Sequence, residues 1–158
     1  MLSENALKEI DRQIAKYPAN QKQSAVMAAL AIAQKEYGWL TSDVKKFIAN
    51  YLSMPAIAVE EVASFYTMYN TKPVGRYKIT LCTNLPCQLK GANEAAACLK
   101  QKLKIDFNET TADGLFTLRE GECMGACGDS PVLIVNDRQM HGMMDQEKIE
   151  VLLAELAK

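Results

Sequence analysis

The sequence is short of several residue types, and each shortage excludes a class of protein. Its 158 residues include a single histidine, which excludes a Rieske-type iron-sulfur centre because that centre needs two. Charge of one sign is also missing, since 18 basic residues stand against 19 acidic ones. Without a basic surface the protein has little means of neutralising phosphates, so we expect no nucleic-acid partner.

Long apolar runs are absent as well. The longest purely apolar stretch, residues 25–33, is far shorter than the roughly 20 residues that span a bilayer, so we expect no direct membrane insertion. Residues 1–5 show neither the positive start nor the apolar stretch of a secretory signal. We therefore expect a cytoplasmic protein with reduced thiols, whose cysteines serve a purpose other than disulfide formation.

Cysteine is absent from the first 81 residues, and all five cysteines follow. This difference divides the chain into an N-terminal helical region, residues 1–72, and a second domain, residues 73–158. In the first region apolar residues recur at helical spacing, which predicts a small bundle. Its four helices are expected at about residues 4–17, 23–35, 42–54 and 59–69, with Ser3 and Thr41 or Ser42 as N-terminal caps and Gly38 as a stop.

The last of these helices, residues 59–69, is apolar almost all round. A helix of this kind is typically buried on more than one side. We therefore expect it to be packed on several sides, either as the joint between the two regions or as a surface that faces a partner.

Beyond residue 75 the apolar period changes to two. Tyr77, Ile79 and Leu81 alternate with more polar residues, which predicts a strand with one buried face. Further strands are expected through residues 116–118, 132–135 and 139–144. Helices are expected on the stripe Leu89, Ala92, Ala96, Leu99, Leu103 and after an Asp145 cap. The order β-α-β-β-β-α predicts an α+β protein in which the helical bundle precedes a thioredoxin-like mixed sheet.

Four of the cysteines form two short pairs, Cys82-x4-Cys87 and Cys123-x3-Cys127. Both pairs are expected in loops at the ends of strands, where four thiolates can converge on one metal centre. A thioredoxin-type redox site is disfavoured, because that chemistry uses two cysteines separated by two residues. Structural zinc stays open, because its paired ligands are two to four residues apart.

The pair spacings favour a 2Fe-2S cluster over zinc. Such a cluster also takes four thiolates but is larger than a single ion, which suits gaps of four and three residues. Gly125 and Gly128 flank the second pair and allow backbone N–H groups to approach sulfur, where they stabilise its negative charge. A zinc-stabilised interaction module remains the alternative from another class.

Several sequence runs carry a resemblance to a known family. They are Phe-Tyr-Thr-Met-Tyr at 65–69, Lys-Pro-Val-Gly at 72–75, Cys-Thr-Asn-Leu-Pro-Cys at 82–87, Glu-Cys-Met-Gly-Ala-Cys-Gly at 122–128, and Pro131-Val132. With them, the chain resembles the small iron-sulfur subunit of bacterial NADH:quinone oxidoreductase (complex I), a thioredoxin-like 2Fe-2S ferredoxin. The resemblance covers nearly the whole chain. It implies one 2Fe-2S cluster bound by Cys82, Cys87, Cys123 and Cys127.

The resemblance also implies a function. The chain would be an electron-transfer subunit of an oxidoreductase and not catalytic alone. It has no phosphate-binding glycine fingerprint, since Gly121, Gly125 and Gly128 do not fit one. NADH and FMN are therefore expected on a larger partner subunit, within an assembly peripheral to the inner membrane that includes other complex I subunits. The equivalent subunit of an NAD-reducing hydrogenase or an NAD-dependent formate dehydrogenase is the alternative.

Other residues are given structural interpretations. Cys98 is expected to pack in a helix as a small apolar residue, and His141 is assigned no role. The position of Pro131 matches the cis-proline of thioredoxin-like folds, but the sequence leaves the isomer of the Ser130-Pro131 bond open. Glu120, Glu122 and Asp129 are acidic residues near the second cysteine pair, and such charge would lower the potential of a cluster.

Overall fold

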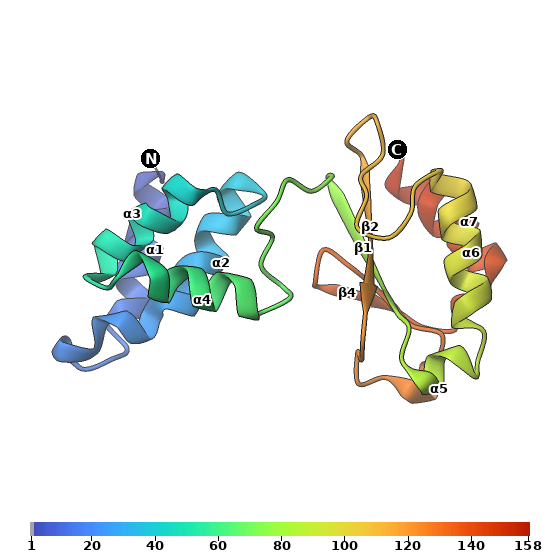
Figure 1. Ribbon diagram of the computed structural model, residues 1–158, viewed down its shortest axis with the longest axis horizontal. Helices are drawn as coiled ribbons and strands as arrows, with labels where there is room; N and C mark the ends of the chain where they lie inside the picture. The colour runs from blue at the N-terminus through green and yellow to red at the C-terminus, as the bar shows by residue number, and fades with distance from the viewer. Residues whose placement is uncertain (1) are drawn as a thin grey trace. The chain divides into compact units, whose positions relative to one another are not determined.

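The structure is a computed structural model that describes residues 2–158 (Figure 1). The chain divides into two compact units, one ending at Pro73 and the other beginning at Val74. The first unit is helical and the second holds the sheet. Each unit has its own hydrophobic core.

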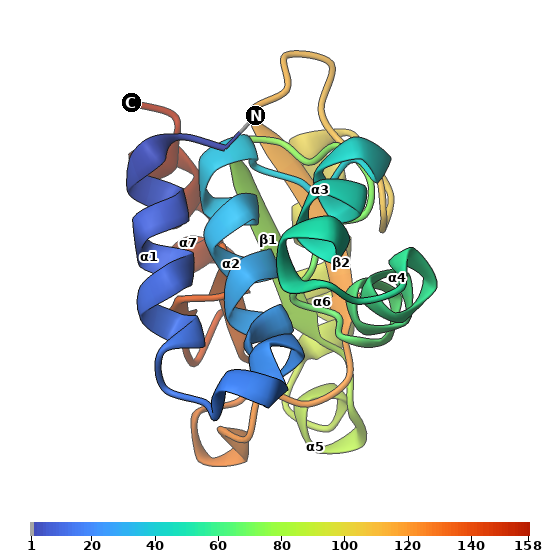
Figure 2. The same ribbon diagram turned by 90° about the vertical axis from the view of Figure 1, so that its left-hand side faces the viewer.

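The first unit contains four α-helices and a 3-10 segment. These are α1 (Glu4–Ile14), η1 (Ala19–Ala25), α2 (Val26–Tyr37), α3 (Ser42–Leu52) and α4 (Ala56–Phe65). Two predicted caps are present, because Ser3 accepts a hydrogen bond from the Ala6 N–H and Thr41 accepts one from the Val44 N–H. Gly38 ends α2 at a φ of 79°, a left-handed conformation that favours glycine. Helices α1 and α2 run alongside one another in the bundle (Figure 2).

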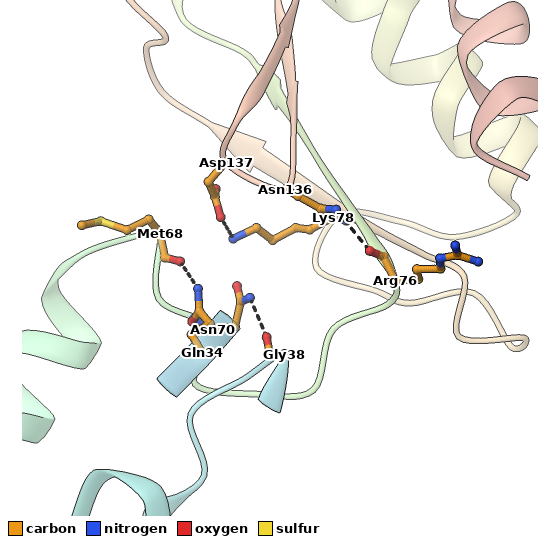
Figure 3. A network of polar contacts seen from close by, with 8 residues as sticks. All are labelled: Gln34, Gly38, Met68, Asn70, Arg76, Lys78, Asn136 and Asp137. Carbon is orange, nitrogen blue, oxygen red and sulfur yellow. Dashed lines mark hydrogen bonds and ion pairs between the residues drawn. The ribbon is translucent and has the colours of Figure 1, made fainter. Parts of the chain in front are cut away.

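The segment after α4 is tied back to α2 by polar contacts (Figure 3). The Gln34 side-chain amide donates to the Met68 carbonyl at 2.8 Å and accepts from the Asn70 N–H. The Asn70 side chain donates to the Gly38 carbonyl at 3.1 Å. Buried Tyr69 completes the attachment, since its hydroxyl donates to a carbonyl of α2. These bonds fix the chain as it leaves the bundle.

The prediction for the fourth helix is wrong in two respects. Helix α4 ends at Phe65, and its buried residues are Val59 and Ala63. Ile57 and Phe65 are 66% and 77% exposed. The reason is that α4 packs against α2 and α3 on one side of the bundle, so its remaining apolar side chains point away from the core.

The second unit is a four-stranded mixed sheet with helices. The strands are β1 (Tyr77–Cys82), β2 (Phe116–Gly121), β3 (Leu133–Val135) and β4 (Gln139–His141), in the order β2-β1-β3-β4. Strand β1 is parallel to β2 and antiparallel to β3, and β3 is antiparallel to β4. The helices are α5 (Leu85–Gln88), α6 (Ala92–Leu103), η2 (Cys127–Asp129) and α7 (Gln146–Leu156). Helices α6 and α7 lie over the same face of the sheet (Figure 1). This architecture confirms the predicted α+β, thioredoxin-like class.

The core of the second unit forms between the sheet and these two helices. Its fully buried side chains include Ile79, Leu81, Leu99, Leu118, Leu133 and Ile149. The Asp145 cap of α7 is present as predicted and accepts from the Lys148 N–H at 2.9 Å. Leu89, predicted on the buried stripe of α6, is 78% exposed. It follows the short helix α5, and the chain turns at Gly91 before α6 begins, so Leu89 does not share the buried face of α6.

Strand β1 differs from the prediction of a single buried face. Lys78, on the polar side of the alternation, is 2% exposed. Its ammonium pairs with the Asp137 carboxylate at 2.6 Å, on the turn between β3 and β4 (Figure 3). Asn136 of the same turn accepts from the Lys78 N–H and donates to the Arg76 carbonyl. A lysine can be buried where a carboxylate compensates its charge.

Candidate metal centre

The strand register brings both cysteine-bearing loops to one edge of the sheet. Cys82 is the last residue of β1 and lies opposite Gly121, the last residue of the parallel strand β2. The segments that follow the two strands therefore begin side by side. They are in contact, because the Cys82 thiol lies 3.1 Å from the Glu122 carbonyl oxygen, to which it donates.

The four predicted ligands form an inner and an outer pair. Cys82 and Cys87 are 3% and 2% exposed and pack with Ala92 and Met124. Cys123 and Cys127 are exposed. All five cysteines, including Cys98, have free thiols. One side of the centre is thus shielded from water by the domain, and the other faces outward.

The sulfur atoms have hydrogen-bond partners from both loops. The Gly125 N–H lies 3.4 Å from Cys123 Sγ and donates to it, which confirms at this glycine the expected approach of backbone to sulfur. Gly125 has a φ of 70°, and its lack of a Cβ permits this turn. On the inner side, Cys87 Sγ lies 3.4 Å from the Ser130 hydroxyl oxygen.

The inner cysteines differ in how readily they lose a proton. Burial raises the pKa of the Cys82 thiol, and its hydrogen bond with Cys87 raises it further, against the opposing effect of the Asn84 and Met124 backbone. Burial also acts to raise the pKa of Cys87. Hydrogen bonds from the Ser130 hydroxyl, the Cys82 thiol and the backbone at residue 132 outweigh burial, so the pKa of Cys87 lies below its usual value. The two inner sulfurs are therefore close enough to share a hydrogen bond, and Cys87 holds the negative charge more easily.

The arrangement does not match a site for a single ion. Within residues 2–158, no three His, Cys, Asp or Glu side chains are grouped closely enough to hold one metal ion. Zinc requires sulfur atoms at about 2.3 Å from a common point. A 2Fe-2S cluster shares its four thiolates between two irons, and a donor set divided into an inner and an outer pair suits this larger group. The residues present thus fit a 2Fe-2S cluster better than zinc.

The remaining cysteine and the histidine lie outside this set. Cys98 is buried in α6 within the core, as predicted. His141 is the last residue of β4, and its Nε2 is buried with no hydrogen-bond partner among the described residues. The Ser130-Pro131 bond, left open by the sequence, is cis.

The chain belongs to the thioredoxin-like [2Fe-2S] ferredoxin family, whose model matches residues 10–157. Among curated proteins, it is 43% identical over 141 residues to a NADH-quinone oxidoreductase subunit of Rickettsia typhi, and the match covers 89% of this chain and 82% of that protein. It is 42% identical over 145 residues to the NADH-quinone oxidoreductase subunit of the same designation in Rhizobium meliloti, with coverage of 92% and 84%. These matches confirm the predicted resemblance, the oxidoreductase-subunit class and a single 2Fe-2S cluster as the cofactor.

A solved structure agrees in fold. The chain superposes on an NAD+-reducing [NiFe]-hydrogenase in the air-oxidized state with a TM-score of 0.75 at 22% identity. The match covers 89% of this chain and 24% of the hydrogenase chain, and it demonstrates the shared fold. Between residues 2 and 158, no helix has the length and apolar character needed to cross a membrane.

Proposed function

We propose that this chain is the electron-transfer subunit of an NADH:quinone oxidoreductase. In this proposal Cys82, Cys87, Cys123 and Cys127 hold the 2Fe-2S cluster, and a partner subunit binds NADH and FMN. When bound, the cluster supplies one-electron transfer. The observation that carries the proposal is the meeting of the two cysteine loops at one sheet edge in a chain 43% identical to a NADH-quinone oxidoreductase subunit.

The chain's own residues support a role in holding and orienting such a group. Buried Cys82 and Cys87 anchor it to the ends of β1 and α5, while Met124 packs beside them and limits access of water. The Gly125 N–H places a donor at Cys123. Exposed Cys123 and Cys127 leave the outer side open to a redox partner. A centre shielded on one side and open on the other is suited to passing electrons to a neighbouring subunit.

A partner subunit is also supported by the surface of the first unit. The exposed apolar side chains at and after α4 are Ile57, Phe65, Tyr66 and Met68. Contiguous exposed apolar side chains of this size often mark protein–protein contacts. This agrees with the second interpretation of the fourth helix, a surface that faces a partner. Attachment to the inner membrane through that assembly is part of the same proposal.

Metal analysis and spectroscopy test the cofactor and its ligands. Protein prepared without oxygen should contain about two iron and two sulfide per chain and should give a 2Fe-2S electron paramagnetic resonance signal after reduction with dithionite. Cys82→Ser and Cys123→Ser should lose or distort that signal. Cys98→Ser is the matched control and should keep it. Colourless protein with one zinc would instead establish the zinc-stabilised module.

Co-purification tests the parent enzyme. A tagged chain should retain a larger subunit that contains FMN and oxidises NADH, together with other subunits of a quinone-reducing assembly. The second candidate is the equivalent subunit of an NAD-reducing hydrogenase, which the shared fold with that enzyme supports. Recovery of a nickel-containing subunit would replace the first candidate with the second.

A further inference from the structure

Ser130 connects the two cysteine loops through its hydroxyl group. Its Oγ donates to the Cys127 carbonyl oxygen at 2.7 Å and lies 3.4 Å from Cys87 Sγ. Cys87 belongs to α5, 43 residues earlier in the chain, whereas Cys127 begins η2. One hydroxyl therefore contacts a predicted ligand from the first loop and the backbone of a predicted ligand from the second.

The direction of the sulfur contact depends on the proton of Cys87. As a thiol, Cys87 donates to the Ser130 oxygen. A metal-bound cysteine is a thiolate, which has no proton and can only accept. The Ser130 hydroxyl has one proton and can rotate to whichever acceptor is stronger. A thiolate carries more negative charge than a carbonyl, so it competes well for that proton.

The Cys127 carbonyl does not lose its partner if the hydroxyl turns. It also accepts the backbone N–H of Ser130 at 3.4 Å. Rotation about the Ser130 side chain thus leaves no acceptor unpaired. This removes the main cost of redirecting the hydroxyl toward sulfur.

We propose that Ser130 is a positioning residue whose hydroxyl donates to the Cys87 thiolate in the loaded protein and raises the reduction potential of the cluster. The inference rests on the proposed ligand role of Cys87. Adding an electron makes the ligand sulfurs more negative, and a donor to sulfur stabilises the reduced state more than the oxidised one. Removing this hydroxyl therefore makes the midpoint potential more negative.

The test compares variants that differ in the hydroxyl at one position. Full-length protein with its cluster is titrated anaerobically, and the midpoint potential is followed by the electron paramagnetic resonance signal. Ser130→Ala is expected to shift the midpoint to more negative values. Ser130→Thr and Ser130→Val have nearly the same shape and differ in the hydroxyl, so the threonine variant should have the higher potential of the two. This pair provides the comparison if Ser130→Ala takes up little cluster.

A second hydroxyl near the site serves as the control. Thr83 Oγ1 donates to Glu120 at 2.9 Å, next to Cys82 in sequence. Thr83→Val removes this hydroxyl and should leave the midpoint at the wild-type value. Equal potentials in the Ser130→Thr and Ser130→Val variants would overturn the inference. Absence of a 2Fe-2S signal from the unaltered protein would instead refute the proposed function itself, so the two failures are distinguishable.

Discussion

Gly142 lies directly against Asp129. A Cβ added at Gly142 would come within 2.7 Å of the Asp129 Cβ and 3.0 Å of its carbonyl oxygen. The next residue, Met143, donates its N–H to the same carbonyl. The chain that follows β4 therefore supports the short η2 turn that begins at Cys127.

We predict that Gly142→Ala displaces this turn and lowers the amount of bound cluster. The added methyl meets backbone and a short side chain that have no room to move, and overpacking of this kind costs about 1–3 kcal/mol. The measurements are iron content and visible absorbance per chain, with thermal unfolding alongside. Gly128→Ala is the matched control, because a Cβ there meets no atom of residues 2–158 within 4 Å. Equal iron content in the two variants would contradict the prediction.

A second prediction compares two leucines that sequence periodicity places on the same stripe. Leu99 is fully buried beneath the sheet, whereas Leu89 is largely exposed. Leu99→Ala should lower the free energy of unfolding by about 2–5 kcal/mol, because it removes apolar contacts and leaves a cavity. Leu89→Ala should change it by less than about 0.5 kcal/mol. Thermal unfolding of the two variants gives the comparison, and similar losses would show that Leu89 is packed.

The third prediction concerns the thiol of Cys98. Burial raises the pKa of this group, and the Glu150 carboxylate raises it further, while Lys102 acts in the opposite direction. The folded protein should therefore resist alkylation of Cys98 by iodoacetamide near pH 8. Addition of denaturant should expose the residue to labelling. Peptide mass spectrometry measures the modification, and labelling of native protein at the rate of denatured protein would contradict the assignment.

The same raised pKa predicts a pH dependence of stability. Between the usual pKa of a cysteine and the raised value, the folded state keeps a proton that the unfolded state has released. The free energy of unfolding must then fall as pH increases through this window. Cys98→Ala removes the group, so its stability should decline less steeply above about pH 8.5. Parallel thermal unfolding curves of wild type and variant across that range would refute this contribution.

The last prediction concerns the apolar side chains at α4. Phe65→Ser should leave thermal stability within about 0.5 kcal/mol of wild type, since the side chain is mostly exposed. The same change should reduce recovery of partner subunits by a tagged chain. Val59→Ala, at a buried position of α4, is the contrasting control and should lower stability. Undiminished recovery with Phe65→Ser would place the partner surface elsewhere.

Local signals in the sequence are sufficient for much of the fold. The caps at Ser3, Thr41 and Asp145 are predictable, because each bonds to a backbone N–H three residues further along. The thioredoxin-like class follows from the alternation of strand and helix patterns along the chain. The errors have a different physical origin. Leu89 fits the helical period of α6 but lies before the turn at Gly91, where one helix has ended and the next has not begun.

Contacts between distant residues are not predictable in this way. Lys78 has the pattern of a solvent-facing strand residue, and its burial depends on Asp137, which lies 59 residues later. Cysteine spacing identifies the candidate ligands, because spacing is itself a sequence property. The contact of Ser130 with Cys87 has no such signal, since neither residue shows from the sequence that the two loops bring them together.

The paired register of β1 and β2 separates the part of the domain that can tolerate added residues from the part that cannot. Cys82 and Gly121 close the ladder at one end, while Tyr77 and Phe116 open it at the other, where the loop from α6 enters. Extra residues inserted at 108–114 would lengthen a surface excursion and leave the spacing of the thiols untouched. A single residue inserted between Leu118 and Cys123 would rotate or shift the second loop against the first. Natural length variation among relatives is therefore expected to be concentrated at the end of the ladder remote from the iron.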